Sequence, residues 1–376
     1  MILHDLHLTG TEGIKHIHIE QGKIKSLNDS LVSAGQRERT IHLDLKGAMA
    51  FPGLINSHDH LDFNLFPRLG NRVYNNYTEW GEDIHSVNKN LISRVEKVPK
   101  PLRVMWGLYK NLLNGFTTVV NHGEKFEIKD DLITVFQDCY PLHSTSFEHK
   151  WKWKLNNPFQ TRKPYVMHLG EGRDEWTKSE IDKVIRWNLF RKKIVAVHGV
   201  AMNEKQSAAF PGLIWCPASN FFLLNRTASV DQLKHSTNVV FGSDSTLTSP
   251  WNLWEHLRQA RDCRMMEEDE LMRSLTIAPA ILWGLSDSGT LAENKIADIV
   301  VTKNTDDFFS LNPEDILLVI HRGQIRLYDE VLADQLKTGL PGKFGCISSG
   351  NRTKHVQGDL SGLVKEIAKY GIQVNW

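Results

Sequence analysis

The stretch Phe51-Pro-Gly-Leu-Ile-Asn-Ser-His-Asp-His60 is a short apolar run that ends in two histidines separated by one residue. Alternate side chains of a β-strand point to the same face, so a strand over Leu54–His60 would place His58 and His60 side by side. Two neutral imidazoles at this spacing can hold one metal ion from one side. The motif is short, and the rest of the chain decides whether it marks a metal site.

The composition excludes several classes of protein. The chain has 376 residues, 41% hydrophobic and 24% charged, which is enough for a large core or for two domains. Its formal net charge of +1 argues against a dedicated binder of nucleic acid or of anionic membranes. No uninterrupted apolar run reaches the length of a membrane span, and residues 1–8 lack the cationic start of a signal peptide. The four scattered cysteines show no metal-pair spacing. We therefore expect a soluble, cytoplasmic protein with no nucleic-acid or membrane partner.

Residues 51–289 alternate short apolar runs with helix-length amphipathic stretches, which is typical of βα repeats around a parallel sheet. This length is close to the roughly 250 residues of a (β/α)8 TIM barrel, so we predict this α/β fold in a somewhat irregular form. Predicted helices include residues 101–114 and 179–191. The predicted strands are Leu54–Ser57, Thr117–Asn121, Cys139–Ser144, Tyr165–His168, Ile194–His198, Leu213–Cys216 and Val239–Gly242.

The eighth strand of such a barrel is expected between residues 144 and 165. Apolar and aromatic residues alternate there with polar residues or lysines from Phe147 to Leu155, which predicts an irregular amphipathic strand. Within it, Lys150-Trp-Lys-Trp-Lys154 interleaves basic and aromatic residues, a pattern also found in RNA-binding surfaces. Because an amphipathic strand explains the alternation equally well, we do not adopt the RNA-binding interpretation.

Both ends of the chain show shorter β patterns. Residues 1–50 form too small a β-unit to be stable alone, and strand-like runs return at 295–302 and 316–323. The simplest arrangement pairs both ends in one small β-sandwich beside the barrel. We therefore predict that residues 1–50 and 290–376 form the flanking β-sandwich and that residues 51–289 form the barrel.

Three further polar residues, His168, His198 and Asp244, stand at the C-terminal ends of predicted strands, as His58 and His60 do. In a parallel barrel these strand ends open onto one mouth, where the active site of such a fold lies. Each residue alone has a simpler explanation, such as a hydrogen bond to a loop or a helix cap. Five residues that converge by topology favour a functional site.

These side chains form a chemically consistent set. Three histidines and one carboxylate suit a borderline divalent ion and leave a coordination position for water. Such a water loses its proton near neutral pH and becomes a nucleophile. Glu171, three residues past His168, would lie over the mouth and could carry a proton between nucleophile and leaving group. Its alternative role is a charge at the start of the next helix, but residues 176–180 are a better helix start.

Motifs along nearly the whole chain resemble those of the amidohydrolase superfamily, and within it the single-metal deaminase branch that includes cytosine deaminase, adenosylhomocysteine deaminase and chlorohydrolases. Their order along the chain makes the resemblance specific. The matching segments are Pro52–His60 (PGxIxxHxH), Gly115–Thr118 (GxTT), His168–Glu171 (HxxE), Val197–Val200 (the sixth-strand histidine motif), Cys216–Asn220 (PxSN), Gly242–Ser245 (similar to GTD) and Ala297–Val301 (ADxVxx).

The resemblance implies one divalent metal ion, zinc in the first place and Fe²⁺ as the alternative. The implied ligands are His58, His60, His168 and Asp244. The implied catalytic residues are Asp244, Glu171 and His198. Glu171 would be the proton shuttle to the leaving group. His198 would hydrogen-bond the attacking water instead of binding the metal. No lysine ends a predicted strand in the middle of the barrel, so the bridged two-metal site of other branches is not expected.

The loops expected to bind the substrate combine features of two groups of enzymes within this branch. Segments 60–62 and 171–174 are similar to cytosine deaminase. Segments 216–220 and 242–247 look closer to adenosylhomocysteine and guanine deaminases and triazine chlorohydrolases, although residues 123–164 are short for that branch. Candidate substrate-binding residues are Arg68, Trp80, His122, Arg173 and Phe221.

We therefore predict a metal-dependent aminohydrolase that deaminates a small, heterocyclic substrate at a C=N carbon. One alternative is hydrolysis of another bond at the same site, with loss of chloride or of an amide amine. An alternative of another class is a non-catalytic barrel scaffold, whose mark would be a degenerate site. This chain keeps all four presumed ligands and Glu171. The expected partner is a small-molecule substrate, and homo-oligomerisation stays open.

Overall fold

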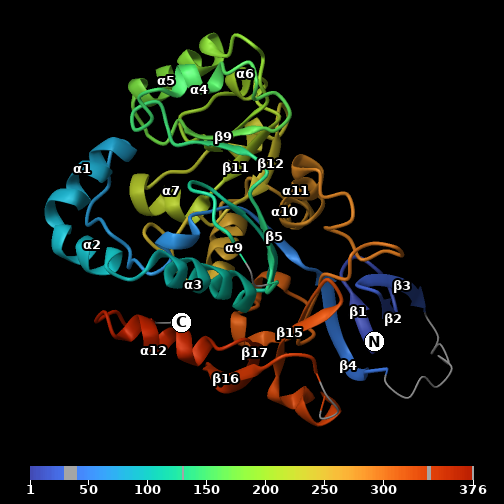
Figure 1. Cartoon of the computed structure of the whole chain (residues 1–376). Helices are drawn as coiled ribbons and strands as arrows, with labels where there is room; N and C mark the ends of the chain where they lie inside the picture. The colour runs from blue at the N-terminus through green and yellow to red at the C-terminus, as the bar shows by residue number, and fades with distance from the viewer. Residues whose placement is uncertain (29–39, 129–130, 337–339, 375–376) are drawn as a thin grey trace.

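The computed structural model describes residues 1–28, 40–128, 131–336 and 340–374. Figure 1 shows an α/β part formed by the middle of the chain and a β-rich part beside it, to which both the blue and the red ends of the chain contribute. The C-terminal helix packs against helix α3 of the α/β part. The candidate site lies in the α/β part.

Eight strands of the α/β part run parallel to their neighbours in two sheets, and their order in space follows their order in the chain. Their inward and outward residues are almost all buried, as expected for a parallel sheet covered on both faces. The three-stranded sheet contains β5 (Leu54–Asp59), β6 (Phe116–Asn121) and β7 (Thr134–Phe136). The five-stranded sheet contains β8 (Tyr140–Leu142), β9 (Tyr165–Leu169), β10 (Ile194–His198), β11 (Gly212–Trp215) and β12 (Asn238–Phe241).

The first and last of these strands meet at their carboxyl ends. The amide groups of Ser243 and Asp244, just after β12, both donate to the carbonyl of His58 on β5 at 3.0 Å. Gly242 makes this approach possible, because a Cβ atom there would lie 2.8 Å from the Cβ of His58 and 2.6 Å from Ile214. The two sheets are therefore joined at this point, and the residues that end β5 and β12 lie together.

Polar caps fix where the two helices α1 and α5 near the site begin. The side chain of Asn76 accepts from the amides of Thr78 and Glu79, and that of Asp174 accepts from the amide of Thr177.

The predicted helices at 101–114 and 179–191 correspond to α3 and α5. The helices are α1 (Tyr77–Val87), α2 (Lys89–Glu96), α3 (Lys100–Leu113), α4 (Trp151–Leu155), α5 (Glu175–Trp187), α6 (Glu204–Ser207), α7 (Pro217–Leu224), α8 (Val230–Leu233), α9 (Leu253–Asp262), α10 (Glu268–Leu275), α11 (Ile277–Trp283) and α12 (Leu360–Ala368), with short 3₁₀ turns at Leu61–Phe63, Phe308–Ser310, Pro313–Asp315 and Glu330–Leu336.

The prediction of an irregular strand between residues 144 and 165 is wrong. Trp151–Leu155 forms the short helix α4, in which Trp151 and Leu155 are buried while Trp153 is 83% exposed. Burial four residues apart is the helical period, so the alternation in the sequence did not reflect the structure. The strand missing from the sequence prediction is β7, which precedes β8. It is only three residues long, which is shorter than most strands and harder to recognise from the sequence.

Strands from both ends of the chain pair in one sheet, as predicted. The strand β4 joins them, because it runs parallel to β1 on one side and antiparallel to β13 on the other. The hydrogen bonds link these strands into one continuous nine-stranded sheet. In spatial order it contains β16 (Phe344–Ser349), β17 (Arg352–Gln357), β15 (Gln324–Asp329), β14 (Ile316–His321), β13 (Ile299–Thr302), β4 (His42–Pro52), β1 (Ile2–Leu8), β2 (Ile14–Glu20) and β3 (Lys23–Asn28).

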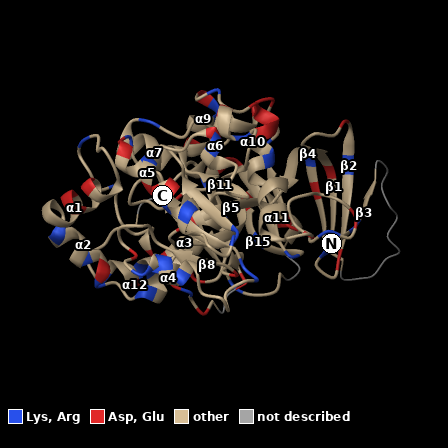
Figure 2. Ribbon diagram, turned by 90° about the horizontal axis from the view of Figure 1, so that it is seen from above, with Lys and Arg blue, Asp and Glu red and all other residues tan. Residues whose placement is uncertain are grey.

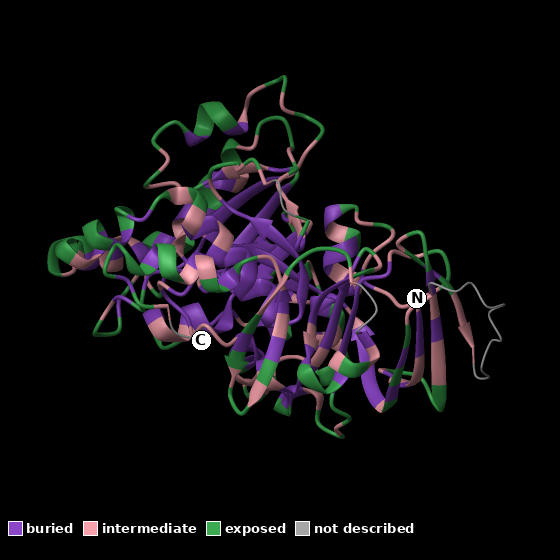
Figure 3. Cartoon of the chain, turned by 60° about the horizontal axis from the view of Figure 1, so that its bottom comes forward, coloured by how far each residue is buried: buried purple, intermediate pink, exposed green. Residues whose placement is uncertain are grey.

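Strand β13 shows how this sheet attaches to the α/β part. Ile299 and Val301 point into an apolar core that belongs to the nine-stranded sheet, whereas Val300 points into the core shared with α3. This alternation follows from the two-residue period of a strand. Figure 3 shows buried residues continuing from the α/β part into the adjoining strands of the nine-stranded sheet.

Charged residues of both signs are interspersed over the helices and strands (Figure 2). This distribution agrees with the near balance of basic and acidic residues in the composition. No helix in the described part of the chain is long and apolar enough to cross a membrane.

Candidate metal centre and active site

Three histidines meet at the carboxyl ends of the parallel strands. His58 belongs to β5, His60 directly follows it, and His168 belongs to β9. One ring nitrogen from each lies within 4.8 Å of the others, and the Nε2 atoms of His58 and His168 are 3.2 Å apart. Converging imidazole nitrogens at these distances can bind one divalent ion together.

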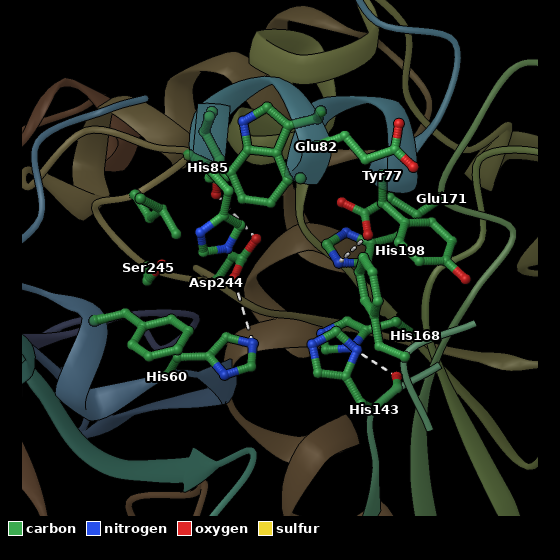
Figure 4. A pocket seen from close by; sticks show the side chains of 17 residues that line it. His60, Tyr77, Glu82, His85, His143, His168, Glu171, His198, Asp244 and Ser245 are labelled. Carbon is green, nitrogen blue, oxygen red and sulfur yellow. Dashed lines mark hydrogen bonds and ion pairs between the residues drawn. The ribbon is translucent and has the colours of Figure 1, made fainter. Parts of the chain in front are cut away.

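Asp244 faces this histidine cluster. Its Oδ1 atom lies 3.7 Å from Nε2 of His60 and 3.9 Å from Nε2 of His58, as the dashed line to His60 in Figure 4 marks. Its Oδ2 atom accepts hydrogen bonds from the hydroxyls of Ser219 at 2.7 Å and Thr248 at 3.0 Å. One carboxylate oxygen is therefore held by the protein, and the other is directed to the histidines.

The environment keeps the ligand nitrogens available. The Nδ1–H group of His168 donates to the carbonyl of His143 at 2.8 Å, which leaves its Nε2 lone pair free to face His58. Burial, together with the neighbouring histidines, holds the pKa of both His58 and His168 well below the usual range. Both imidazoles are therefore neutral near pH 7, the state in which they bind metal ions. The donor set of three imidazoles and one carboxylate fits a single divalent ion such as zinc.

Glu171 and His198 form a second pair beside the cluster. The Nε2 atom of His198 lies 3.5 Å from Oε2 of Glu171, and the side-chain amide of Asn220 donates to Nδ1 of His198 at 2.9 Å. Burial lowers the pKa of His198 to about 4. Burial raises the pKa of Glu171 well above its usual range, and Asp244 and Glu180 raise it further. The site therefore favours the protonated form of Glu171, next to a neutral imidazole.

Two of the site residues have a backbone conformation that is rare for side chains with a Cβ. The φ angle is 71° at His198 and 61° at Asp244, in the left-handed region. Both residues stand at or just beyond the end of a strand, where the chain turns over the site. Such conformations persist only where surrounding contacts hold them, and they concentrate at functional sites.

These residues line a cavity of about 510 Å³. His60, His168, Glu171, His198 and Asp244 form its floor, and helix α1 lies across from them (Figure 4). Apolar and aromatic side chains form most of the walls, which is usual for small-molecule sites. The further lining residues are Phe63, Tyr77, Trp80, Gly81, Glu82, Ile84, His85, His143, Phe147, Ser245, Leu247 and Thr248.

One buried carboxylate connects three segments of the cavity wall. Glu180, on α5, is fully buried and accepts from the amide of Gly170 at 2.8 Å, the hydroxyl of Thr145 at 2.6 Å and the hydroxyl of Tyr77 at 3.2 Å. Gly170 directly precedes Glu171. Burial raises the pKa of Glu180 to about 7. This residue was missed by the sequence analysis, in which it appears only as part of a helix start.

A buried ion pair lies behind the two histidines of β5. Asp59, between His58 and His60, is 3.3 Å from Nζ of Lys110 on α3, and both side chains are fully buried. The side-chain amides of Asn64 and Asn111 donate to the same carboxylate at 2.7 and 2.8 Å. This network fixes the end of β5 to α3. The sequence gives no sign of it, because its members are far apart in the chain.

Of the candidate substrate-binding residues, Trp80 lines the cavity and His122 lies close to it. His122 is buried, and its ring centroid is 4.5 Å from that of His168. It therefore packs beside a presumed ligand and is not among the described residues that line the cavity. Its Nδ1 atom has no hydrogen-bond partner in the described part of the chain.

The other three candidates lie away from the cavity. Arg68 stacks over the ring of Phe222, with 5.5 Å between the guanidinium carbon and the ring centroid, and lines a different hollow. Arg173 is exposed and directed to Asn75. Phe221 is on α7 and is not among the described lining residues. These three were chosen for their place next to motifs, and neighbours in sequence turn to different sides of a loop or helix.

The comparisons with known proteins agree with this arrangement. Residues 153–326 match the sequence profile of the amidohydrolase family, a region that contains His168, Glu171, His198 and Asp244. The chain is 22% identical to a 5-methylthioadenosine/S-adenosylhomocysteine deaminase of Caldicellulosiruptor saccharolyticus over 382 residues, which covers 83% of this chain and 88% of that protein.

Two solved structures have a similar fold. The first is an adenosine deaminase from Xanthomonas campestris with bound zinc, with a TM-score of 0.69 and 15% identity over 98% of this chain and 97% of that one. The second is an aminofutalosine deaminase from Helicobacter pylori, with a TM-score of 0.65 and 12% identity over 86% of this chain and 99% of that one. Residues 153–326 are therefore similar to the amidohydrolase family, and the chain shares the fold of these two solved structures.

Proposed function

We propose that this protein is a metal-dependent aminohydrolase that removes an amino group from a C=N carbon of a small heterocycle. The observation that carries the proposal is the convergence of three histidines and Asp244 beside the Glu171–His198 pair at one cavity. The names of the deaminases that the chain resembles support it. The zinc in the Xanthomonas enzyme favours zinc over Fe²⁺.

The proposal includes a barrel architecture. Strands β5 to β12 follow one another in space, and β5 and β12 are bonded to each other, which supports a (β/α)8 barrel within residues 51–289. Residues 1–50 and 290–376 would form the flanking β domain. In such a barrel the carboxyl ends of all eight strands face one mouth, where residues from several strands can act on one substrate.

In this proposal His58, His60, His168 and Asp244 hold the ion. The ion would supply Lewis-acid activation of water at neutral pH. Ser219 and Thr248 hold the far oxygen of Asp244, so its near oxygen keeps its orientation toward the histidines.

Glu171 and His198 would carry the proton chemistry. Loss of ammonia from an amidine-like carbon requires a proton on a poor leaving group, and the protonated carboxyl of Glu171 can deliver it. His198 has its Nδ1 engaged by Asn220, so the proton of its neutral ring is on Nε2, the atom that faces Glu171 and the cavity. From there it can donate to the oxygen nucleophile and orient it.

Loss of chloride at the same site is less well supported, and loss of an amide amine is disfavoured by the deaminase names of the similar proteins. Chloride leaves without a proton, so a carboxyl held in its protonated form has no role in that step. A non-catalytic scaffold would not require the ligand nitrogens, Asp244 and Glu171 to remain together at one cavity. The deaminase assignment accounts for all of these features.

The direct test is ammonia release by metal-loaded protein from a panel of aminopurines, aminopyrimidines, pterins and triazines. We expect at least one of these heterocycles to release ammonia with a turnover that chelation abolishes and zinc restores. Release of chloride from a chlorotriazine without any ammonia release from the panel would favour the chlorohydrolase alternative.

A further inference from the structure

The walls of the cavity present aromatic faces, and the polar atoms of these aromatic side chains face other groups of the protein. The hydroxyl of Tyr77 is directed to Glu180, and the indole N–H of Trp80 donates to the carbonyl of Leu69 at 2.7 Å. The rings of Tyr77 and Phe147 pack edge to face, with centroids 5.4 Å apart. These side chains therefore offer stacking and apolar surface to a bound molecule, and not hydrogen bonds.

The orientation of a substrate follows from the position of the presumed ligands. Its reacting carbon must lie on the floor of the cavity, near His60 and His168. Figure 4 shows Glu82 and His85, both on α1, at the opposite end of the cavity. Any substituent remote from the reacting carbon therefore extends toward α1, where it meets Trp80, Ile84 and the exposed carboxylate of Glu82.

The charges at this end do not suit an anionic substituent. A phosphate or carboxylate is normally bound by arginine, lysine or converging amides that replace its water. The remote end of this cavity offers apolar rings, the imidazole of His85 and the carboxylate of Glu82, and this carboxylate repels an anion. Among the described lining residues, the acidic ones are Glu82, Glu171 and Asp244, and none is a lysine or arginine.

We infer that the substrate is an uncharged aminoheterocycle with an apolar substituent, such as an uncharged nucleoside, and that Glu82 disfavours substrates with an anionic substituent. This inference rests on the proposed function for the position of the reacting carbon. It adds that the protein discriminates between neutral and anionic members of one substrate class. The metal centre itself does not distinguish them.

Two matched pairs of compounds test it with metal-loaded, full-length protein. One pair is 5-methylthioadenosine and the analogue in which a 2-carboxyethylthio group replaces the methylthio group, so that the two compounds differ by one carboxylate. The other is adenosine and its 5′-monophosphate. We expect kcat/KM to be higher for the uncharged member by at least about 100-fold, since juxtaposed like charges cost several kcal/mol in recognition. Equal kcat/KM values within a pair would overturn the inference.

Measurements of substrate binding distinguish a failure of this inference from a failure of the proposed function. The dissociation constants of all four compounds are measured by calorimetry on metal-loaded Glu171→Gln protein, which does not need turnover. If the uncharged members bind more tightly but neither they nor any heterocycle of the panel is deaminated by wild-type protein, the proposed function fails and the inference stands. If the anionic members bind as tightly, or none of the four binds at millimolar concentration, the inference is overturned.

Substitution of Glu82 provides a second test. Glu82→Lys should shift the ratio of kcat/KM values, or of dissociation constants, toward the anionic member by at least about 10-fold, because it replaces repulsion by attraction. The matched control is Glu96→Lys, an equal charge change at an exposed site on α2 that does not line the cavity. An equal shift in both variants would contradict a specific role for Glu82.

Discussion

His198 and Glu171 face each other at 3.5 Å, measured from Nε2 to Oε2, and both side chains are buried. Neither is a member of the histidine cluster that can bind a metal ion. Burial lowers the pKa of His198 to about 4 and raises that of Glu171, so the uncharged form of each side chain is favoured. Their positions therefore separate the proton chemistry from metal binding.

Glu171→Gln should retain the metal ion and substrate binding but lose turnover. The amide keeps the shape of the carboxyl but carries no proton that titrates, so we expect kcat to fall by on the order of 10² or more. His198→Asn should also retain the ion. Elemental analysis and steady-state kinetics of both folded variants check this. A variant that is folded but metal-free would identify that residue as a ligand, and wild-type turnover in Glu171→Gln would exclude the proton-shuttle role.

Glu180 should act through the segments that it holds. In Glu180→Ala the amide of Gly170 and the hydroxyls of Thr145 and Tyr77 lose their common acceptor, so Glu171 and the cavity wall lose their fixed positions. We expect kcat to fall by about 10-fold or more, with metal content unchanged. Glu180→Gln keeps an acceptor oxygen and should recover part of this loss. Glu175→Gln, at an exposed position on the same helix, is the control. Unchanged kinetics in Glu180→Ala would show that these bonds do not position the site.

The ion pair of Lys110 and Asp59 should be important for stability. Lys110→Met leaves a buried carboxylate without its cation, which we expect to lower the free energy of unfolding by about 3–5 kcal/mol. Lys154→Met, which breaks the exposed pair with Glu148, should cost less than about 1 kcal/mol. Denaturant unfolding of the metal-free proteins measures both values. Similar small losses in the two variants would contradict the importance of the buried pair.

His256 should make the metal-free protein less stable at acidic pH. Burial lowers its pKa to about 3, whereas its unfolded value is near 6.5. Between these values the unfolded chain binds a proton that the folded chain does not, so stability is lost as the pH falls below about 6.5. His256→Gln should make this loss less steep by about 1.4 kcal/mol per pH unit between pH 6 and pH 5. Unfolding curves at several pH values test this, and an unchanged slope would contradict it.

Much of the fold and the metal-binding set could be predicted because local patterns report them. The two-residue period of a strand places His58 and His60 on one face, and parallel strands bring His168, His198 and Asp244 to the same end. These patterns depend on residues close in sequence. The structure places these five side chains around one cavity or directly beneath it.

What was missed depends on contacts between distant segments. The strand β7 is only three residues long and was not recognised, so the eighth strand was expected between residues 144 and 165 instead. Glu180 is polar and within a helix, and only its three distant donors distinguish it from a solvent-exposed glutamate. Arg68 was chosen as a pocket residue for its position in the chain, and its side chain stacks on Phe222 instead.

The most direct test of the central claim is the metal content of the folded His58→Ala, His60→Ala double variant, measured with its ammonia release. Wild-type protein should bind one equivalent of a divalent ion, most readily zinc, and the double variant should bind none and release no ammonia. The control is His149→Ala, at an exposed position outside the cavity, which should behave as wild type. A stoichiometric ion retained by the double variant would contradict the assignment of the site.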